Sequence, residues 1–237
     1  MVARLWYGSS VRVCVFDLDN TLIRSPLDLA AMAADMRALL ESACGLLPPR
    51  PERYRVGELV AWCRERAPDL EPRIWEVALA HERRALGDAA LEPGAREAIR
   101  GACAAGFRTA LWTNNAREVT LAVLDRFALA RDLEPVVTRD EMERLKPDPA
   151  GWRVISDHFT ARLGRGTASP RTAITAVVVG DSWVDGVAAA AAGLPFVAYR
   201  ASQADLDRWN VTPIARLEDL AGLPAWLAAY RPDGHGA

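Results

Sequence analysis

The chain has 237 residues, of which 51% are hydrophobic, and its 29 basic and 31 acidic side chains give a formal net charge of −2. This length and apolar content predict one α/β domain with a large insertion, or two small domains. The near-neutral charge argues against a dedicated nucleic-acid-binding protein, which would carry a basic face. No apolar run is long enough to cross a bilayer, so we expect a soluble cytoplasmic protein.

The four cysteines are scattered along the chain, at Cys14, Cys44, Cys63 and Cys103. They form no CxxC pair and show no spacing typical of zinc ligands. We therefore expect buried free thiols in a reducing compartment.

The stretch VRVCVFDLDNTL, residues 11–22, combines a predicted strand with two acidic residues. Val11–Phe16 form a short, largely apolar and β-branched run, which is typical of a buried strand. Asp17 and Asp19 follow directly, and Asn20–Thr21 suit a turn. A strand that ends in carboxylates belongs at the carboxyl edge of a parallel sheet, where the ligand sites of α/β proteins lie.

Two neighbouring carboxylates repel each other, so this pair needs a compensating partner. A divalent cation such as Mg²⁺, which prefers carboxylate and carbonyl oxygens, would provide one. One acid could then attack an electrophile while the other transfers a proton. A strand end closed by an Asx-turn explains the same residues equally well, so the pair alone does not decide between the two readings.

The segment after this strand predicts an all-helical insertion over residues 25–90. Ser25 suits the N-cap position, and apolar residues at helical spacing predict a helix from Pro26 to about Ala43. Two further helices are expected over Val56–Arg66 and from about Pro72 to Leu86. Five cationic side chains of the insertion are candidates for a contact with substrate, although most are expected at the solvated surface: Arg64, Arg66, His81, Arg83 and Arg84.

The rest of the chain alternates strand and helix patterns, as in a parallel α/β sheet. Strands are expected at residues 107–112, 134–138, 176–179 and 196–199. Helices are expected at residues 95–105, 116–128, 140–144, 151–163 and 184–192. We also expect a loop at residues 164–172, a helical layer over 206–227 and a frayed tail at 233–237.

Polar residues follow two of these later strands. Thr113, Asn114 and Asn115 come after the strand at 107–112, and their hydroxyl and amide donors could bind phosphate oxygens. A turn with a helix N-cap is the alternative explanation. Asp181 and Asp185 follow the strand at 176–179, in the sequence GDSWVD.

Lys146 is the only lysine in the chain. A position that keeps lysine against a strong arginine bias is explained by a need for a compact ammonium, which a guanidinium replaces poorly, or by chance. The residue stands in the sequence LKPDP, where two prolines restrict the backbone, so its side chain is presented at a rigid break.

In this order, DLDNT at residues 17–21, Thr113, Lys146 and GDSWVD at residues 180–185 resemble the four motifs of the haloacid dehalogenase (HAD) superfamily. The resemblance covers about residues 11–200, and the insertion is similar to the α-helical type 1 cap of phosphoglycolate-phosphatase-like members. It implies an α/β fold, with a Rossmann-like parallel sheet core flanked by helices and an inserted α-helical cap domain. We predict residues 1–24 and 91–237 as the catalytic core and 25–90 as the cap.

The resemblance also implies roles for the acidic residues. Asp17 would attack phosphorus and form an aspartyl-phosphate, while Asp19 would protonate the leaving oxygen and then activate water. Mg²⁺ would be held by Asp17, the backbone carbonyl of Asp19, and Asp181, with support from Asp185.

Phosphate binding is implied for a second group of residues. Thr113, Asn114 and Lys146 would bind the phosphoryl oxygens. The helix that starts near Ala116 would point its positive end at the same site.

Two features refine the resemblance. Members that cleave carbon–halogen bonds lack an acid two residues after the nucleophile, so Asp19 favours phosphoryl transfer. Related sequences often read DGTL, whereas this chain reads DNTL followed by Ile23, Arg24 and Ser25. Arg24 lies at the hinge into the cap and could face an anionic substrate.

We therefore predict a Mg²⁺-dependent phosphatase that hydrolyses a small phosphorylated metabolite, acts as a monomer or homodimer, and has no nucleic-acid or membrane partner. A phosphomutase acting on a sugar phosphate is one alternative, because it shares the core and the aspartyl-phosphate. A non-catalytic phosphate-binding regulatory protein is another, although the intact acids Asp17, Asp19 and Asp181 argue against it.

Overall fold

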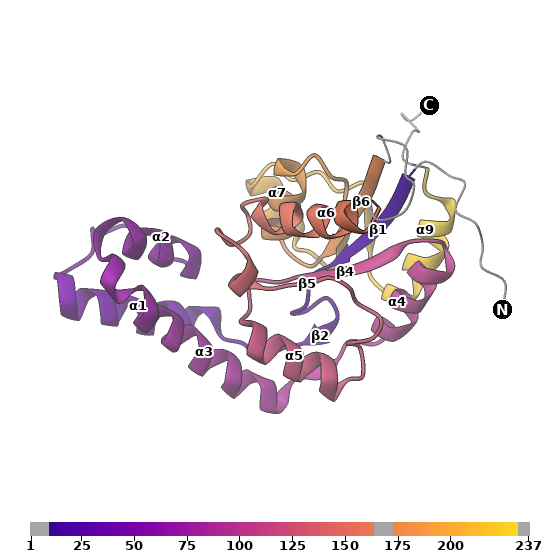
Figure 1. The fold of residues 1–237 in the computed structure, drawn as a ribbon. Coiled ribbons are helices and arrows are strands. Elements are labelled where there is room, and N and C mark those ends of the chain that lie inside the picture. The colour runs from indigo at the N-terminus through magenta and orange to yellow at the C-terminus, as the bar shows by residue number, and fades with distance from the viewer. Residues whose placement is uncertain (1–9, 164–172, 232–237) are drawn as a thin grey trace.

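The central sheet consists of six parallel strands (Figure 1). The computed structural model describes residues 10–163 and 173–231. The strands are β1 Ser10–Phe16, β4 Arg108–Trp112, β5 Val136–Val137, β6 Ala173–Gly180, β7 Phe196–Tyr199 and β8 Ala215–Leu217. Their order in the sheet is β5-β4-β1-β6-β7-β8. β1 therefore lies between β4 and β6, with Phe16 in register with Leu111 on one side and Val179 on the other.

Helices cover both faces of this sheet. They are α4 Ala95–Ala104, α5 Arg117–Arg126, α6 Ala150–Leu163, α7 Trp183–Ala191, α8 Gln203–Arg208 and α9 Leu223–Ala229. Successive residues of a strand point to opposite faces. Cys14 and Phe16 accordingly pack with α4, α5 and α9, whereas Val13 and Val15 pack with α6, α7 and α8. Because β1 is buried on both faces, its sequence is nearly continuously apolar.

The inserted cap is a helical unit with a hydrophobic core of its own. It contains α1 Leu29–Cys44, α2 Val56–Arg66, the short 3₁₀ helix η1 Pro68–Leu70, and α3 Glu71–Asp88. Met36, Leu40, Leu59 and Ile74 are fully buried among these helices. The two-stranded antiparallel ribbon of β2 Ile23–Arg24 and β3 Ala90–Leu91 leads into and out of the cap. The fold class that the sequence predicts is thus confirmed, and so is the helix over Val56–Arg66.

Two expected helices differ in the structure. α1 begins at Leu29 rather than Pro26, because Asp28 and not Ser25 is the N-cap: Asp28 Oδ1 accepts the N–H groups of Ala30 and Ala31 at 2.9 Å. Residues 140–144 do not form a helix. The chain makes only the 3₁₀ turn η2 Arg139–Glu141, whose side chains are engaged with neighbouring elements, and then leads to Lys146.

The expectation of a wholly helical C-terminal layer is also wrong, because Ala215–Leu217 pair with β7 and form the edge strand β8. Pairing with an existing strand overrides the local helical pattern. All four cysteines are free, but only Cys14 and Cys63 are buried. Cys44 and Cys103 are exposed, because they lie at the last residue of α1 and on the solvent side of α4.

Some expectations concern parts that the structure does not reach. The predicted loop at 164–172 and tail at 233–237 lie outside the described residues. Within the described ranges, no helix has both the length and the apolar character needed to span a membrane.

The cap core generates a stability prediction. Leu40 is fully buried, whereas Leu46, just beyond α1, is 87% exposed. We expect Leu40→Ala to lower the free energy of unfolding by about 2–5 kcal/mol, because it leaves a cavity. The matched control Leu46→Ala should change it by less than about 0.5 kcal/mol. Urea unfolding measures both values, and equal losses would contradict a separately packed cap core.

Candidate active site

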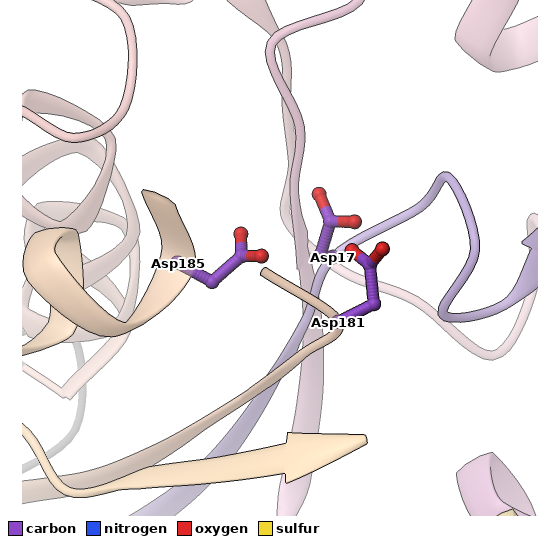
Figure 2. A group of neighbouring side chains, drawn as sticks. All are labelled: Asp17, Asp181 and Asp185. Atoms are coloured by element: carbon purple, nitrogen blue, oxygen red, sulfur yellow. The ribbon is translucent and has the colours of Figure 1, made fainter. Parts of the chain in front are cut away.

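Three aspartate side chains converge at the carboxyl edge of the sheet (Figure 2). Asp17 follows β1, Asp181 follows β6, and Asp185 lies in the first turn of α7. One carboxylate oxygen of each lies within 4.8 Å of the other two. Because β1 and β6 are paired, their ends bring Asp17 and Asp181 together, and the turn into α7 adds the third acid.

The ammonium of Lys146 is buried against these carboxylates. Nζ donates to Asp17 Oδ1 and to Asp185 Oδ1, each at 2.6 Å, and to the carbonyl of Trp112 at 2.8 Å. These contacts use all three ammonium protons. Burial alone would lower the pKa of Lys146, but the charges of Asp17 and Asp185 outweigh it and raise that pKa. Lys146 is therefore a fixed cation at the site.

Asn114 holds the backbone of this lysine. Its Nδ2 donates to the Lys146 carbonyl at 3.0 Å, and its Oδ1 accepts the Lys146 N–H at 2.8 Å. Asn114 therefore positions Lys146, and a phosphate contact through the second N–H of its Nδ2 stays a prediction. Thr113 is buried beside it, and its Oγ1 accepts the N–H of Asn115 at 3.2 Å. A phosphate contact for Thr113 stays a prediction.

Asp185 supports the cluster from α7. Its Oδ2 accepts from the Ser182 hydroxyl at 2.6 Å and from the Ser182 N–H at 3.2 Å, while Oδ1 accepts from Lys146. Gly180 makes this close approach possible, because a Cβ there would lie 2.5 Å from Asp185 Cγ. With both of its oxygens engaged, Asp185 is suited to orienting the site rather than to offering a free ligand atom.

Crowding makes the ionised acids unfavourable. Burial, with the charges of Asp17 and Asp185, raises the pKa of Asp181 to about 8. Burial also raises the pKa of Asp17 to about 7; Asp185 and Asp19 add to the rise, while Lys146 opposes it. A divalent cation would compensate these charges and replace the protons. The carboxylate oxygens of Asp17 and Asp181 are a donor set that fits Mg²⁺, and Asp185 lies beside them in support.

Asp19 lies close in sequence but belongs to a different contact set. Asn115 Nδ2 donates to its Oδ2 at 2.5 Å, and the Ser25 hydroxyl also donates to the carboxylate. Burial raises the pKa of Asp19, and these hydrogen bonds oppose the rise. A raised pKa suits a carboxyl that both gives and takes a proton. Asn115 belongs to the polar run after β4 whose donors the sequence suggests for phosphate, and the structure directs its amide to Asp19, a contact that the sequence does not predict.

The backbone conformation of Asn20 explains why asparagine can stand where related sequences have the glycine of DGTL. Its φ of +56° lies in the left-handed region, which glycine adopts freely and asparagine tolerates better than most other residues. Its N–H donates to the Ile23 carbonyl at 2.6 Å and closes the turn into the hinge ribbon.

The N-terminus of α5 is occupied by side chains. Ala116 N–H donates to Glu82 Oε2 of the cap at 3.1 Å, and Arg117 N–H donates to Asp140 Oδ2 at 2.6 Å. We expect from the sequence that this helix end faces the phosphate. Two of the N–H groups at this end, however, donate to carboxylates of the protein itself. Glu82 is absent from the predicted site, because no local pattern signals a contact that spans 34 positions in the chain.

Arg24 lies in the hinge strand β2, and its Nε is 3.6 Å from Glu92 Oε2. The buried Glu92 also accepts from the Tyr199 hydroxyl at 2.6 Å and from Arg200 at 2.8 Å. These contacts join the hinge to the core. A contact between Arg24 and the substrate stays a prediction.

A cleft of about 460 Å³ lies between the cap and the core and is lined by Arg53 and Arg55. The Arg55 guanidinium lies 4.6 Å from the ring centroid of Trp209 and 5.1 Å from that of Trp183. The two indoles stack at 3.9 Å. Trp183 stands two residues after Asp181, so the loop that carries this acid also forms part of the cleft wall.

Four of the five cap cations predicted from the sequence have partners elsewhere. They are Arg64 with Glu71 and the Glu143 carbonyl, Arg66 with Glu65, His81 with Asp35, and Arg83 with Glu118. The sequence gives no reason to single out Arg53 and Arg55 instead, because only folding brings both to this cleft and brings Arg55 to Trp183 and Trp209.

Comparisons with known proteins agree with this geometry. The model of a family described as haloacid dehalogenase-like hydrolase matches residues 11–193. A phosphoglycolate phosphatase of Rhodospirillum rubrum is 27% identical over 247 residues, which cover 94% of this chain and 93% of the relative. A phosphoglycolate phosphatase of Pseudomonas fluorescens is 31% identical over 217 residues, which cover 82% of this chain and 71% of the relative.

A solved structure has the same fold. It is a HAD-superfamily hydrolase of subfamily IA from Geobacter sulfurreducens, with a TM-score of 0.55 and 23% sequence identity. The match covers 93% of this chain and 98% of that structure.

The raised pKa of Asp181 generates a prediction about stability. The folded protein keeps a proton on Asp181 up to pH about 8, whereas an unfolded chain releases it near pH 3.9. The unfolded state therefore binds fewer protons in this interval, and the metal-free protein should lose stability as pH rises through it. In EDTA, melting temperatures across this range should fall less steeply for Asp181→Asn than for the wild type. Parallel curves for the two proteins would contradict the assignment.

Proposed function

We propose that this chain, a phosphatase of the haloacid dehalogenase-like hydrolase family, hydrolyses small soluble phosphomonoesters. The proposed reaction depends on Mg²⁺ and passes through an aspartyl-phosphate. One observation carries the proposal: the two acids of DLD have different surroundings. Asp17 faces Lys146 and two further acids, whereas Asp19 is held apart by Asn115. This difference supports nucleophilic attack by Asp17 and proton transfer by Asp19.

In the first half-reaction, a carboxylate oxygen of Asp17 bonds to phosphorus while the bond from phosphorus to the leaving oxygen breaks. Asp19 gives its proton to that oxygen, so the product leaves as an alcohol. In the second, Asp19 takes a proton from water, whose oxygen bonds to phosphorus as the bond to Asp17 breaks. Inorganic phosphate is released, and Asp19 is protonated again.

Thr113 would bind a phosphoryl oxygen, and the positive charge of Lys146, whose three N–H groups are engaged with Asp17, Asp185 and the Trp112 carbonyl, would offset the negative charge that gathers there. Mg²⁺ would be held by the carboxylates of Asp17 and Asp181 and by the backbone carbonyl of Asp19, with Asp185 in support. When bound, the ion supplies positive charge that offsets the repulsion between the acids and the phosphoryl group.

A compact anionic substrate suits the cap. The relatives from R. rubrum and P. fluorescens are phosphoglycolate phosphatases, which supports a short phosphorylated acid as the substrate class. Three arginines, Arg53, Arg55 and Arg208, line the cleft between cap and core against two acids, Glu52 and Asp205, and guanidinium groups bind carboxylates well. A docked cap would also exclude bulk water during the reaction.

We expect the wild type to release phosphate from small phosphomonoesters when Mg²⁺ is present and to stop in EDTA. Asp17→Asn should lose more than about 10³-fold of the rate, because the amide is not a nucleophile. The matched control Asp69→Asn, at an exposed site in η1, should keep full activity. The measurement is phosphate release by the wild type, Asp17→Asn and Asp69→Asn from a panel of esters that includes 2-phosphoglycolate and sugar phosphates.

Phosphate release that persists equally in Asp17→Asn would contradict the assignment of the nucleophile. Isomerisation of a sugar phosphate without phosphate release would identify a phosphomutase. Binding of phosphate esters without either reaction would identify a regulatory protein.

A further inference from the structure

The peptide bond between Asn115 and Ala116 is held on both sides. The Ala116 N–H donates to Glu82 Oε2 at 3.1 Å, and the Asn115 carbonyl accepts the N–H of Arg139 at 3.1 Å. Glu82 belongs to the cap helix α3, whereas Arg139 belongs to the core turn η2. The cap thus supplies one of the two groups that fix this peptide.

Glu82 and Arg139 are also bonded to each other, because the Arg139 guanidinium donates to Glu82 Oε1. Their side chains are 3% and 7% exposed, respectively. The same guanidinium lies 4.9 Å from the ring centroid of Trp75, which also belongs to the cap helix α3. Separating a buried ion pair leaves two uncompensated charges, so this contact ties the position of α3 to the turn η2.

The side chain of the held residue reaches the acid that transfers protons. Asn115 is buried, and its Nδ2 donates to Asp19 Oδ2 at 2.5 Å. Asp19, Ser25, Glu82 and Asn115 line one cavity of only about 10 Å³. A space of this size holds at most a single water molecule, so it offers Asp19 little solvent to replace the bond from Asn115.

We propose that Glu82 is a positioning residue that makes proton donation by Asp19 depend on the docked cap. With the cap docked, Glu82 and Arg139 fix the Asn115–Ala116 peptide, and the Asn115 amide then holds the Asp19 carboxyl toward the leaving oxygen. This inference rests on the proposed function and assigns that site a cap-borne control of its acid step.

The test compares two leaving groups. An alkyl phosphate needs a proton from Asp19 when its alkoxide leaves, whereas p-nitrophenyl phosphate releases a stabilised phenolate that needs none. For both substrates, kcat/KM covers the reaction up to departure of the leaving group. Loss of the acid step therefore lowers kcat/KM for the alkyl ester selectively, whereas general damage to the site lowers both values.

The variants are Glu82→Ala and Asn115→Ala, with Glu82→Gln as the conservative substitution. Glutamine keeps an acceptor for the Ala116 N–H, but its NH₂ group, in place of the second oxygen, cannot accept from Arg139. Glu118→Ala is the matched control. It removes the exposed ion pair between Arg83 of α3 and Glu118 of α5, which are 2.7 Å apart, and so breaks another contact between α3 and the start of α5. Melting temperatures identify any variant that does not fold.

We expect Asn115→Ala to lower kcat/KM for the alkyl ester by about 10²-fold and Glu82→Ala by about tenfold, within the range of general acid catalysis. For p-nitrophenyl phosphate both should stay within about threefold of the wild type. Glu82→Gln, which keeps one of the two bonds, should fall between Glu82→Ala and the wild type on the alkyl ester, and Glu118→Ala should match the wild type on both esters.

Equal losses on the two esters, or unchanged alkyl activity in folded Glu82→Ala, would overturn the inference while leaving the phosphatase intact. If Glu82→Ala does not fold, Asn115→Ala together with Glu82→Gln decides the question in the same way. A wild type that is inactive on both esters would instead overturn the proposed function, and this inference with it.

Discussion

The structure depends on a concentration of charge at one edge of the sheet. Three carboxylates lie within 4.8 Å of one another, and a single buried ammonium bonds to two of them. Such a group is stable only where every oxygen has a donor or a cation, because ionised acids far from water are costly. Lys146 meets part of that need, and the raised pKa values of Asp17 and Asp181 show the part that remains. The site is therefore arranged for further positive charge, which suits a phosphoryl-transfer enzyme that uses a metal ion.

The backbone of the core brings these charged groups together. Parallel strands β1 and β6 deliver Asp17 and Asp181 to one point, and the missing side chain at Gly180 allows Asp185 to approach. Asn114 fixes the lysine from the next strand end through two hydrogen bonds to its backbone. Asp19 is kept out of the cluster by Asn115, whose own peptide is held in part by the cap. In the proposed reaction, the acid that transfers protons would thus be linked to the cap, whereas the nucleophile would depend on the core alone.

The sequence predicts the parts of this arrangement that are contiguous along the chain. The apolar run before Asp17 and the GDSWVD segment identify strand ends and acids, because a buried strand and a tight turn each have a local pattern. Contacts between distant segments leave no such trace: Glu82 meets Ala116, and Arg55 meets Trp209, only in the folded chain. The short edge strand β8 is missed because its pairing with β7 outweighs its local pattern. Asn114 is a donor in the expected place, but folding directs its amide to Lys146.

The most direct test of this account is to capture the intermediate on Asp17. In Asp19→Asn, p-nitrophenyl phosphate can still transfer its phosphoryl group, because nitrophenolate leaves without a proton, but water is no longer activated. Rapid quenching followed by mass spectrometry of peptides should then find a phosphoryl group on Asp17, in an amount equal to the nitrophenolate released. Nitrophenolate release with no phosphoryl group on Asp17, or with the group on another residue, would contradict Asp17 as the nucleophile.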